Sequence, residues 1–150
     1  MANDFQRLVR RDVLAKLKGN SALIAIVPAS SIYGQAPVAE PAWPFIKLGP
    51  IQELPRRASC LNGADVNFGI HAFSRGRWTA PVPPRQLLEI AEDHASRIGT
   101  AIKAVLDRGA SDLPGVGRVR YLLADRNLMV DAGEPDAFHW YATVQARVIA

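Results

Sequence analysis

The stretch that decides the fold runs from residue 85 to residue 107 and reads RQLLEIAEDHASRIGTAIKAVLD. Its apolar residues recur every three or four positions and line one arc of a helix, while polar residues occupy the opposite arc. The apolar arc comprises Leu87, Ile90, Ala91, Ala95, Ile98, Ala101, Ile102 and Val105. Acidic residues in the early half suit the helix dipole, and Arg108-Gly109 suits a helix stop. This stretch is therefore predicted to be an amphipathic helix.

Around this helix the sequence favours strands. Residues 64–72 alternate apolar and polar side chains, which is the period of a half-buried strand. After the helix, two long β-prone runs are joined by turn-forming residues 131–136 and predict a terminal hairpin. Two shorter runs, rich in β-branched and aromatic residues, precede them. The predicted strands are residues 31–34, 43–49, 64–72, 117–130 and 137–149.

A second amphipathic helix is predicted near the start of the chain, over residues 5–18. Asp4 is a suitable N-cap, and Gly19-Asn20 provides a stop. Residues 21–27 are predicted to form a helical turn. The element order is then α-β-β-β-α-β-β, and both helices can bury their apolar faces against one face of a sheet. We expect a single α+β domain over residues 1–150, with an antiparallel or mixed sheet of about five strands.

Two connections are expected to lie outside these elements. Residues 50–63 contain prolines and the turn formers Asn62-Gly63, a composition typical of a mobile loop. Residues 75–85 (RGRWTAPVPPR) cannot continue a central strand and must form an exposed connection. Long proline-rich connections of this kind are usually functional arms or disordered segments, so we expect both segments to contact other protein chains. The residues expected at such contacts are Arg56, Arg57, Arg75, Arg77, Trp78 and Arg85.

Composition places the chain among ordinary globular proteins. Its 150 residues are 49% hydrophobic and 21% charged, and no apolar run is long enough to cross a bilayer. Residues 1–20 lack the features of a secretion signal, so we expect a soluble protein that is synthesised in the cytoplasm and has no membrane partner. The single cysteine, Cys60, excludes an intrachain disulfide and a cysteine metal cluster, and we expect it to have no reactive role.

The basic excess of the chain is concentrated near its N-terminus. The net charge is +4, and residues 1–20 hold five basic and two acidic residues. On the predicted helix, Arg7, Arg11 and Lys18 project from one side, where they could follow a phosphate backbone or remain a solvated surface. No recognition-helix motif or RNA-binding aromatic signature accompanies them. We favour the solvated surface and retain a small DNA-binding module as the alternative.

No group of residues has the spacing of a catalytic or metal site. Asp93 and His94 lie on the long helix rather than beside a nucleophile, and the chain lacks a G-x-S-x-G turn. His94 falls on the apolar side, where a core or interface histidine with one hydrogen bond is the commoner case. His71 and His139 are expected to be strand residues, and residues 115–117 a turn. We therefore expect no enzyme activity, no cofactor and no metal ion.

The order of several short motifs resembles a known family, the tail terminator, tail completion or tail-to-head joining proteins of long-tailed phages and gene transfer agents. Ser31-Ile32-Tyr33-Gly34 is similar to the family's short Ile-Tyr strand. Residues 43–49 (WPFIKLG) are similar to its Pro-aromatic-aliphatic strand with a Leu-Gly end. His71-Ala72-Phe73-Ser74-Arg75 occupies the place where the family has an aromatic residue before a serine. With the long helix and the terminal hairpin, the resemblance spans nearly the whole chain.

This resemblance implies a non-enzymatic structural protein of the virion. The family's protomers form a ring, expected here to be a hexamer, that stacks on the last ring of tail tube protein and stops its growth. The ring also binds the head completion or connector complex, and DNA passes through its lumen without sequence-specific binding. The implied location is the tail-neck junction of the virion, after assembly in the host cytoplasm. Another connector protein of the neck is the alternative.

Overall fold

The computed structural model describes residues 3–58 and 61–150. The helices are α1 (Phe5–Gly19), α2 (Ser21–Ile24), the short 3-10 helix η1 (Ala29–Ser31) and α3 (Ala91–Leu106). The strands are β1 (Ile32–Tyr33), β2 (Phe45–Ala58), β3 (Leu61–Ser74), β4 (Arg77–Trp78), β5 (Leu87–Glu89), β6 (Ala110–Leu113), β7 (Gly117–Val130) and β8 (Phe138–Ile149). Cys60, which we expect to have no reactive role, lies outside the described residues.

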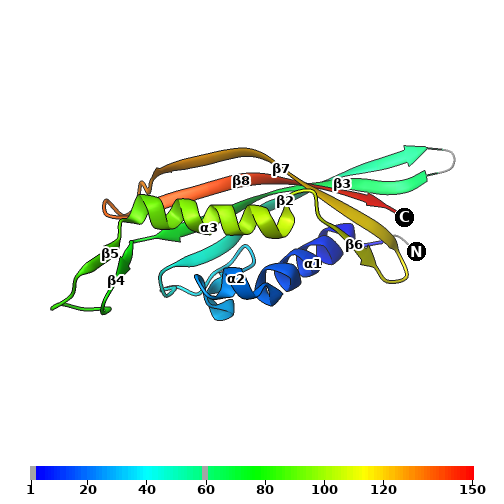
Figure 1. The fold of residues 1–150 in the computed structure, drawn as a ribbon. Helices are drawn as coiled ribbons and strands as arrows, with labels where there is room; N and C mark the ends of the chain where they lie inside the picture. Colours follow the sequence, from blue (N-terminus) through cyan, green and yellow to red (C-terminus); the bar gives the residue numbers. More distant parts are fainter. Residues whose placement is uncertain (1–2, 59–60) are drawn as a thin grey trace.

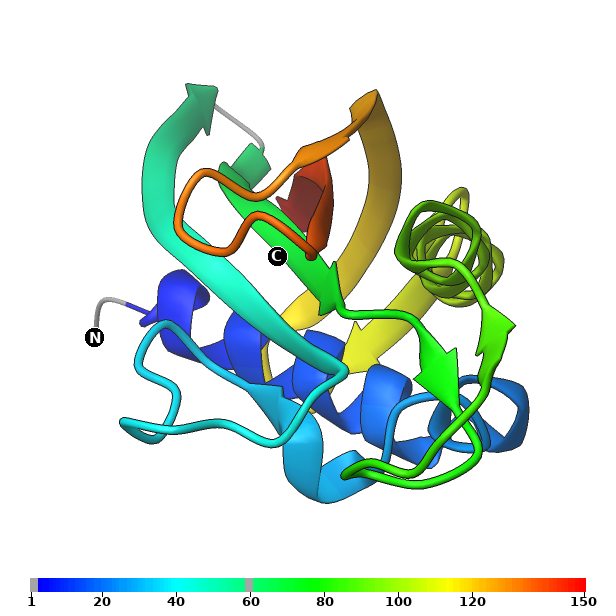
Figure 2. The ribbon, with the colours of Figure 1, turned by 90° about the vertical axis from the view of Figure 1, so that its left-hand side faces the viewer.

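Six of these strands form one mixed sheet in the order β1-β2-β3-β8-β7-β6. Strand β1 runs parallel to β2, and the other neighbouring strands are antiparallel. The sheet curls so that β2 and β7 rise on either side of β3 and β8 like the walls of a trough (Figure 2). The α+β class is confirmed, but the described residues place six strands in this sheet rather than about five, and form three α-helices rather than two.

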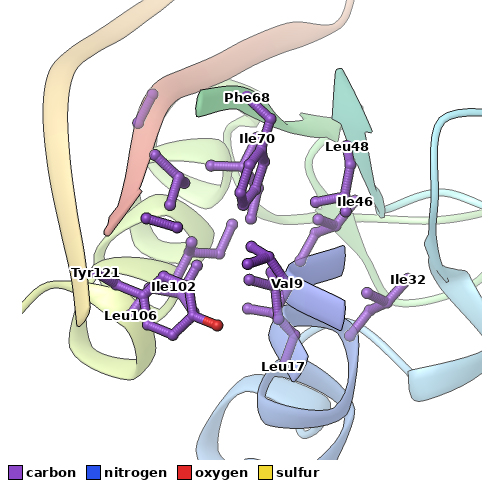
Figure 3. Packing of buried hydrophobic residues seen from close by; sticks show 14 of the residues in the cluster. Val9, Leu17, Ile32, Ile46, Leu48, Phe68, Ile70, Ile102, Leu106 and Tyr121 are labelled. Carbon is purple, nitrogen blue, oxygen red and sulfur yellow. The ribbon is translucent and has the colours of Figure 1, made fainter. Parts of the chain in front are cut away.

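The long helices α1 and α3 lie on the convex face of the sheet, outside the trough (Figures 1 and 2). Helix α1 begins as predicted, because the side chain of Asp4 accepts a hydrogen bond from the N–H of Arg7 at 3.0 Å. Its buried residues are Phe5, Val9, Val13 and Leu17, spaced one helical turn apart. They pack with apolar side chains of the sheet and of α3 in one hydrophobic core (Figure 3).

Two polar side chains tie α1 to the far edge of the sheet. Asp12 accepts a hydrogen bond from the hydroxyl of Tyr121 on β7, and Lys16 donates to the carbonyl of Ala110 on β6 at 3.4 Å. Tyr121 is buried, and burial together with the Asp12 carboxylate raises the pKa of its hydroxyl above the ordinary tyrosine value. The tyrosine therefore stays neutral and acts as a hydrogen-bond donor to the helix.

Helix α3 approaches the sheet closely where it crosses Trp140 on β8. A Cβ atom added to Gly99 would lie 2.2 Å from Cε2 of the indole, far inside van der Waals contact. The neighbouring helix residues Ile98 and Ile102 are fully buried. A glycine at position 99 thus allows the indole to fill the space between helix and strand.

The segment expected to be a mobile loop spans residues 50–63, and its described residues 50–58 and 61–63 instead belong to two long paired strands. Strands β2 and β3 pair from Phe45 with Phe73 out to Ala58 with Leu61, with a bulge between Leu48 and Ile51. The loop prediction is wrong because a proline interrupts a strand only where its missing N–H would have joined the ladder. Beyond the short pairing with β1, strand β2 is the edge of the sheet, where a missing proline N–H costs no ladder hydrogen bond.

The helix predicted from residue 85 begins later, at Ala91. Residues 87–89 form strand β5, and Ile90 is still extended with φ −65° and ψ 153°. Leu87, expected on the apolar arc of the helix, is exposed, because it pairs with Trp78 outside the domain. Strand β6, over residues 110–113, was not predicted at all. It pairs with the start of β7, and residues 114–116 form the turn expected around Gly115.

Candidate assembly surfaces

Residues 75–90 form an arm that extends past one end of the sheet (Figure 1). Strands β4 and β5 pair within it as an antiparallel ribbon. Beyond them, the N–H of Thr79 donates to the carbonyl of Gln86 at 2.9 Å, and the N–H of Gln86 donates to Oγ1 of Thr79 at 2.9 Å. Residues 81–88 are all exposed. The arm is therefore an ordered ribbon with an exposed tip.

The base of the arm is fixed by a buried serine–histidine pair. Oγ of Ser74, at the end of β3, lies 2.7 Å from Nδ1 of His94 on α3 and accepts the N–H of Gly76 at 2.9 Å. Gly76 has φ +87°, and a Cβ atom there would lie 2.8 Å from the carbonyl oxygen of Glu89. His94 is thus a core histidine with a hydrogen-bond partner, as predicted. Ser74 is fully buried, so this pair holds the arm and presents no nucleophile.

Glu89 binds the arm to α3 through Arg97 and also pairs with Arg77 inside the arm. Arg97 of α3 donates two hydrogen bonds to its carboxylate, at 3.1 and 2.7 Å, and Arg77 of β4 lies 3.6 Å away. The hydrogen bonds from Arg97 lower the pKa of Glu89 against the opposing effect of burial. Burial in turn lowers the pKa of His94, with further contributions from both guanidinium groups, while Glu89 opposes the shift. His94 is therefore neutral at physiological pH.

Trp78, the expected interface anchor, is half-buried within the arm itself. The guanidinium of Arg85 lies over its ring, 4.1 Å from the centroid, and the indole N–H donates to the carbonyl of Arg75 at 3.1 Å. Arg85 also donates to the carbonyl of Pro81 at 3.1 Å. The indole therefore does not fold onto the core, and the Arg85–Trp78 pair forms a stacked surface on the arm.

Arg75 links the arm to two other segments at the same end of the sheet. Its guanidinium lies 4.2 Å from the ring centroid of Trp43 and pairs with Glu134 at 3.0 Å. An open concavity of about 1250 Å³ lies here, between Trp43, Trp78 and the first turn of α3. The structure thus brings together the expected contact residues Arg75, Arg77, Trp78 and Arg85.

Arg56 and Arg57 lie at the opposite end of the sheet, near the tip of the β2–β3 hairpin (Figure 1). Arg56 binds the carboxylate of Asp65, which Arg147 on β8 also binds at 3.1 Å. Burial alone raises the pKa of Asp65, but the hydrogen bonds and charges of Arg56 and Arg147 outweigh it, so the pKa lies below its ordinary value. The expected contact residues therefore form two separate groups.

The basic face expected on the first helix is present on α1. Arg7, Arg11 and Lys18 are exposed, and Arg7 pairs with Asp4 at 3.2 Å. This face points away from the sheet, since the opposite side of α1 carries the buried residues. It is remote from the inside of the trough.

The uncovered, concave face of the sheet was not predicted as a site. It carries a row of aromatic rings, in which Phe45 stacks on Phe73 at 4.7 Å between centroids and Phe73 on His139 at 4.3 Å. The polar alternation of residues 64–72 predicted that one face would stay uncovered. Which residues of different strands meet there depends on register, which single strands do not reveal. Residues 3–58 and 61–150 contain no group of three candidate metal ligands, and none of their helices could span a membrane.

The curled sheet with helices on its convex face also occurs in a solved structure. A chain in the solved structure titled "Virion of native gene transfer agent (GTA) particle" is similar, with a TM-score of 0.67 at 19% sequence identity. The superposition covers 92% of this chain and 92% of that chain. At this identity the likeness establishes the fold alone.

Residues 11–149 match the family model described as tail completion protein gp17. Because the match spans most of the chain, the protein belongs to the tail completion protein gp17 family, and the expected family membership is confirmed. It is thus a structural protein of a bacteriophage-type virion. No curated protein sequence matches this chain.

Proposed function

We propose that the protein forms a ring, with six copies, that caps the tail tube and joins it to the head connector at the tail-neck junction. Membership of the tail completion family supports a role at the end of the tail. The ring also requires a head-to-tail contact, in which one patch of each copy meets a different patch of the next. DNA passes through the lumen without sequence-specific binding. Assembly takes place in the host cytoplasm.

The arm is the observation that carries this proposal. It extends beyond the domain, its base is fixed by Ser74 and Glu89, and its exposed part carries the Arg85–Trp78 stack. Arginine and tryptophan are enriched among the residues that dominate binding at protein interfaces. A rigid ribbon loses little conformational entropy on binding, which favours its use as a contact. We infer that the arm bridges to the next copy or to the neighbouring ring.

The test is to shorten the arm without disturbing its base. Replacing residues 80–85 by Asn-Gly keeps Thr79 and Gln86 paired through a tight turn and removes the tip with Arg85. This variant and Trp78→Ala are expected to keep the thermal unfolding midpoint of the domain, to form no rings in electron micrographs, and to leave tails unjoined to heads. Thr100→Ala, on the exposed side of α3, is the matched control. Normal rings and joined tails from both arm variants would contradict the proposal.

A DNA-binding role of α1 is the second candidate, favoured by the exposed side chains of Arg7, Arg11 and Lys18. It predicts affinity for duplex DNA that falls steeply with added salt, because bound lysines and arginines release counterions. The triple variant Arg7→Ala/Arg11→Ala/Lys18→Ala would weaken that binding at low salt. Absence of salt-dependent binding by the wild-type protein would rule this role out.

A further inference from the structure

A groove lies in the concave face of the sheet at the end opposite the arm. We call it the end groove. It has a volume of about 460 Å³ and is open to solvent. Its lining includes Asp65, Asn67, Arg120, Leu122, Gln145 and Arg147, which come from β3, β7 and β8. Helices α1 and α3 both lie on the other face of the sheet, so neither covers the groove (Figure 2).

The end groove is positively charged. Arg120 on β7 is directly opposite Arg147 on β8. On its other side, Arg147 is opposite Asp65 on β3. Arg56 shares the Asp65 carboxylate with Arg147, and Arg120 adds a third guanidinium beside Arg147, so these four groups carry a net charge of about +2. Arg120 is exposed and forms no ion pair with any other described residue. Its guanidinium is available to an anionic partner.

Apolar side chains border these arginines. Leu54, Leu122 and Ile149 are each nearly half exposed, at 48%, 47% and 48%. Leu54 is paired with Asp65 across β2 and β3, while Leu122 and Ile149 line the groove itself. Arginine surrounded by exposed aliphatic side chains is the composition of a protein interface. Asn67 and Gln145 in the lining would also suit nucleic acid, but phosphates and sugars would not cover the exposed aliphatic border, so a protein segment with carboxylates is the better occupant.

This chain carries such a segment in the turn between β7 and β8. Residues 131–136 (DAGEPD) hold three carboxylates and no basic residue, and we call them the acidic turn. The turn is ordered, since the N–H of Asp131 donates to the Ala137 carbonyl at 2.9 Å and the N–H of Ala137 donates to the Glu134 carbonyl at 3.0 Å. Arg75 offsets one carboxylate by pairing with Glu134. The remaining charge of about −2 matches that of the end groove.

The acidic turn and the end groove of one copy cannot meet. The turn precedes the start of β8 at Phe138, whereas Arg147 lies nine residues further along that strand. At about 3.3 Å per residue, roughly 30 Å separates them. The turn and the parts of β3, β7 and β8 that line the groove also lie at opposite ends of the same sheet (Figure 1). Two complementary patches at opposite ends are what a head-to-tail contact between copies requires.

We propose that the acidic turn of each copy docks in the end groove of the next copy. This contact rests on the proposed ring and names the surfaces that close it. The arm and the acidic turn lie at the same end of the molecule and are joined by Arg75 and Glu134, so both reach the next copy together. Carboxylates of the turn approach Arg120 and Arg147, and the apolar border excludes water around them.

The experiment exchanges charges between the two patches. Variant G reverses the groove (Arg120→Glu/Arg147→Glu), and variant T reverses the turn (Glu134→Lys/Asp136→Lys). Each alone is expected to abolish rings in electron micrographs and in sedimentation, because like charges then meet at every contact. A chain carrying all four substitutions, and an equimolar mixture of G and T, are both expected to recover rings, since opposite charges again meet at every contact. Wild-type rings are expected to dissociate as salt is raised.

Two controls keep the experiment interpretable. Arg7→Glu/Arg11→Glu makes the same change of net charge as variant G on α1 and is expected to form normal rings. Arg120→Glu alone disturbs no recorded ion pair and is expected to weaken assembly at least tenfold while the unfolding midpoint stays unchanged. It therefore replaces variant G if that variant fails to fold.

Each remaining outcome counts against a specific claim. Rings formed by folded variant G, or no recovery in either rescue, would overturn the docking contact and leave the ring itself in place. Loss of duplex DNA binding by variant G with intact rings would make nucleic acid the occupant and the self-contact wrong. A wild-type protein that forms no ring under any salt condition would overturn the proposed function, and the contact with it.

Discussion

Nδ1 of His71 and Nε2 of His139 lie 2.7 Å apart on the concave face of the sheet, so one imidazole donates a hydrogen bond to the other. The imidazole of His71 packs over two glycines. A Cβ atom added to Gly69 would lie 2.8 Å from Nε2 of His71, and one added to Gly49 would lie 3.1 Å from it. Burial, the neighbouring imidazole and Lys47 lower the pKa of His71 to about 4. Burial also lowers the pKa of His139, although Asp131 opposes the shift. Both rings are neutral at pH 7.

This pair predicts a loss of stability in mild acid. The unfolded chain protonates histidine near pH 6.5, whereas the folded protein resists protonation of His71 down to about pH 4. The unfolded state therefore binds more protons between these values, and the free energy of unfolding falls as the pH is lowered through that window. The double variant His71→Phe/His139→Phe is expected to show a shallower decline in urea midpoints between pH 7 and pH 4.5. An unchanged decline would assign the effect to other groups, such as His94.

Gly99 predicts a steric effect on the packing of α3. Alanine at this position places a methyl group 2.2 Å from the Trp140 indole, so the helix or the ring must move. We expect Gly99→Ala to destabilise the protein by about 1–3 kcal/mol, the usual cost of overpacking a core. Gly19→Ala is the matched control, because an added Cβ there meets nothing within 4 Å. Equal unfolding midpoints for the two variants would contradict the close approach.

Asp12 and Tyr121 predict a measurable coupling between α1 and β7. Tyr121→Phe removes the hydroxyl and leaves the part-buried Asp12 carboxylate without this donor, at a cost of about 1–3 kcal/mol. In the double variant with Asp12→Ala, the loss should be smaller than the sum of the two single losses, which a double-mutant cycle of denaturation free energies measures. Strict additivity would show that the hydrogen bond contributes nothing to stability.

Ser74 predicts a local effect at the base of the arm. Its hydroxyl accepts the N–H of Gly76, so Ser74→Ala should speed hydrogen exchange of that amide and cost about 1 kcal/mol of stability. Amides in the middle of β3, such as that of Phe68, should retain their protection in the same experiment. Equal acceleration at both positions would mean that the whole domain is loosened, and that the serine does not act on the arm in particular.

Much of this fold could be predicted from sequence because periodicity reports burial. Helix α1 and strand β8 follow their expected spacing, since each buries one regular stripe of residues in the core. The wrong predictions concern segments whose structure is set by strand pairing and not by burial in the core. Residues 87–89 have the period of α3 but form β5 and pair with β4, and residues 50–58 contain prolines that an unpaired strand edge tolerates.

The candidate surfaces were predictable only in part. The composition of residues 75–85 indicated an exposed arm with Trp78 and its arginines. The groups that fix the arm could not be found from spacing, because Ser74 meets His94 across twenty residues and Glu89 meets Arg97 only after β5 turns into α3. The end groove needs the register of β3, β7 and β8, which no single strand encodes.

The attachment of the arm has a genetic consequence. Its two strands continue directly from β3 and into α3, and both of these elements are packed in the core. About seven residues separate Gly76 from the tip, so the tip lies roughly 20 Å from the base, and a tilt of roughly 10° at the base displaces it by roughly 4 Å. Core substitutions that merely shift α3, such as at Gly99, would therefore misplace the arm in a protein that still folds. Conditional alleles that block virion production at high temperature are expected at such buried positions, far from any contact surface.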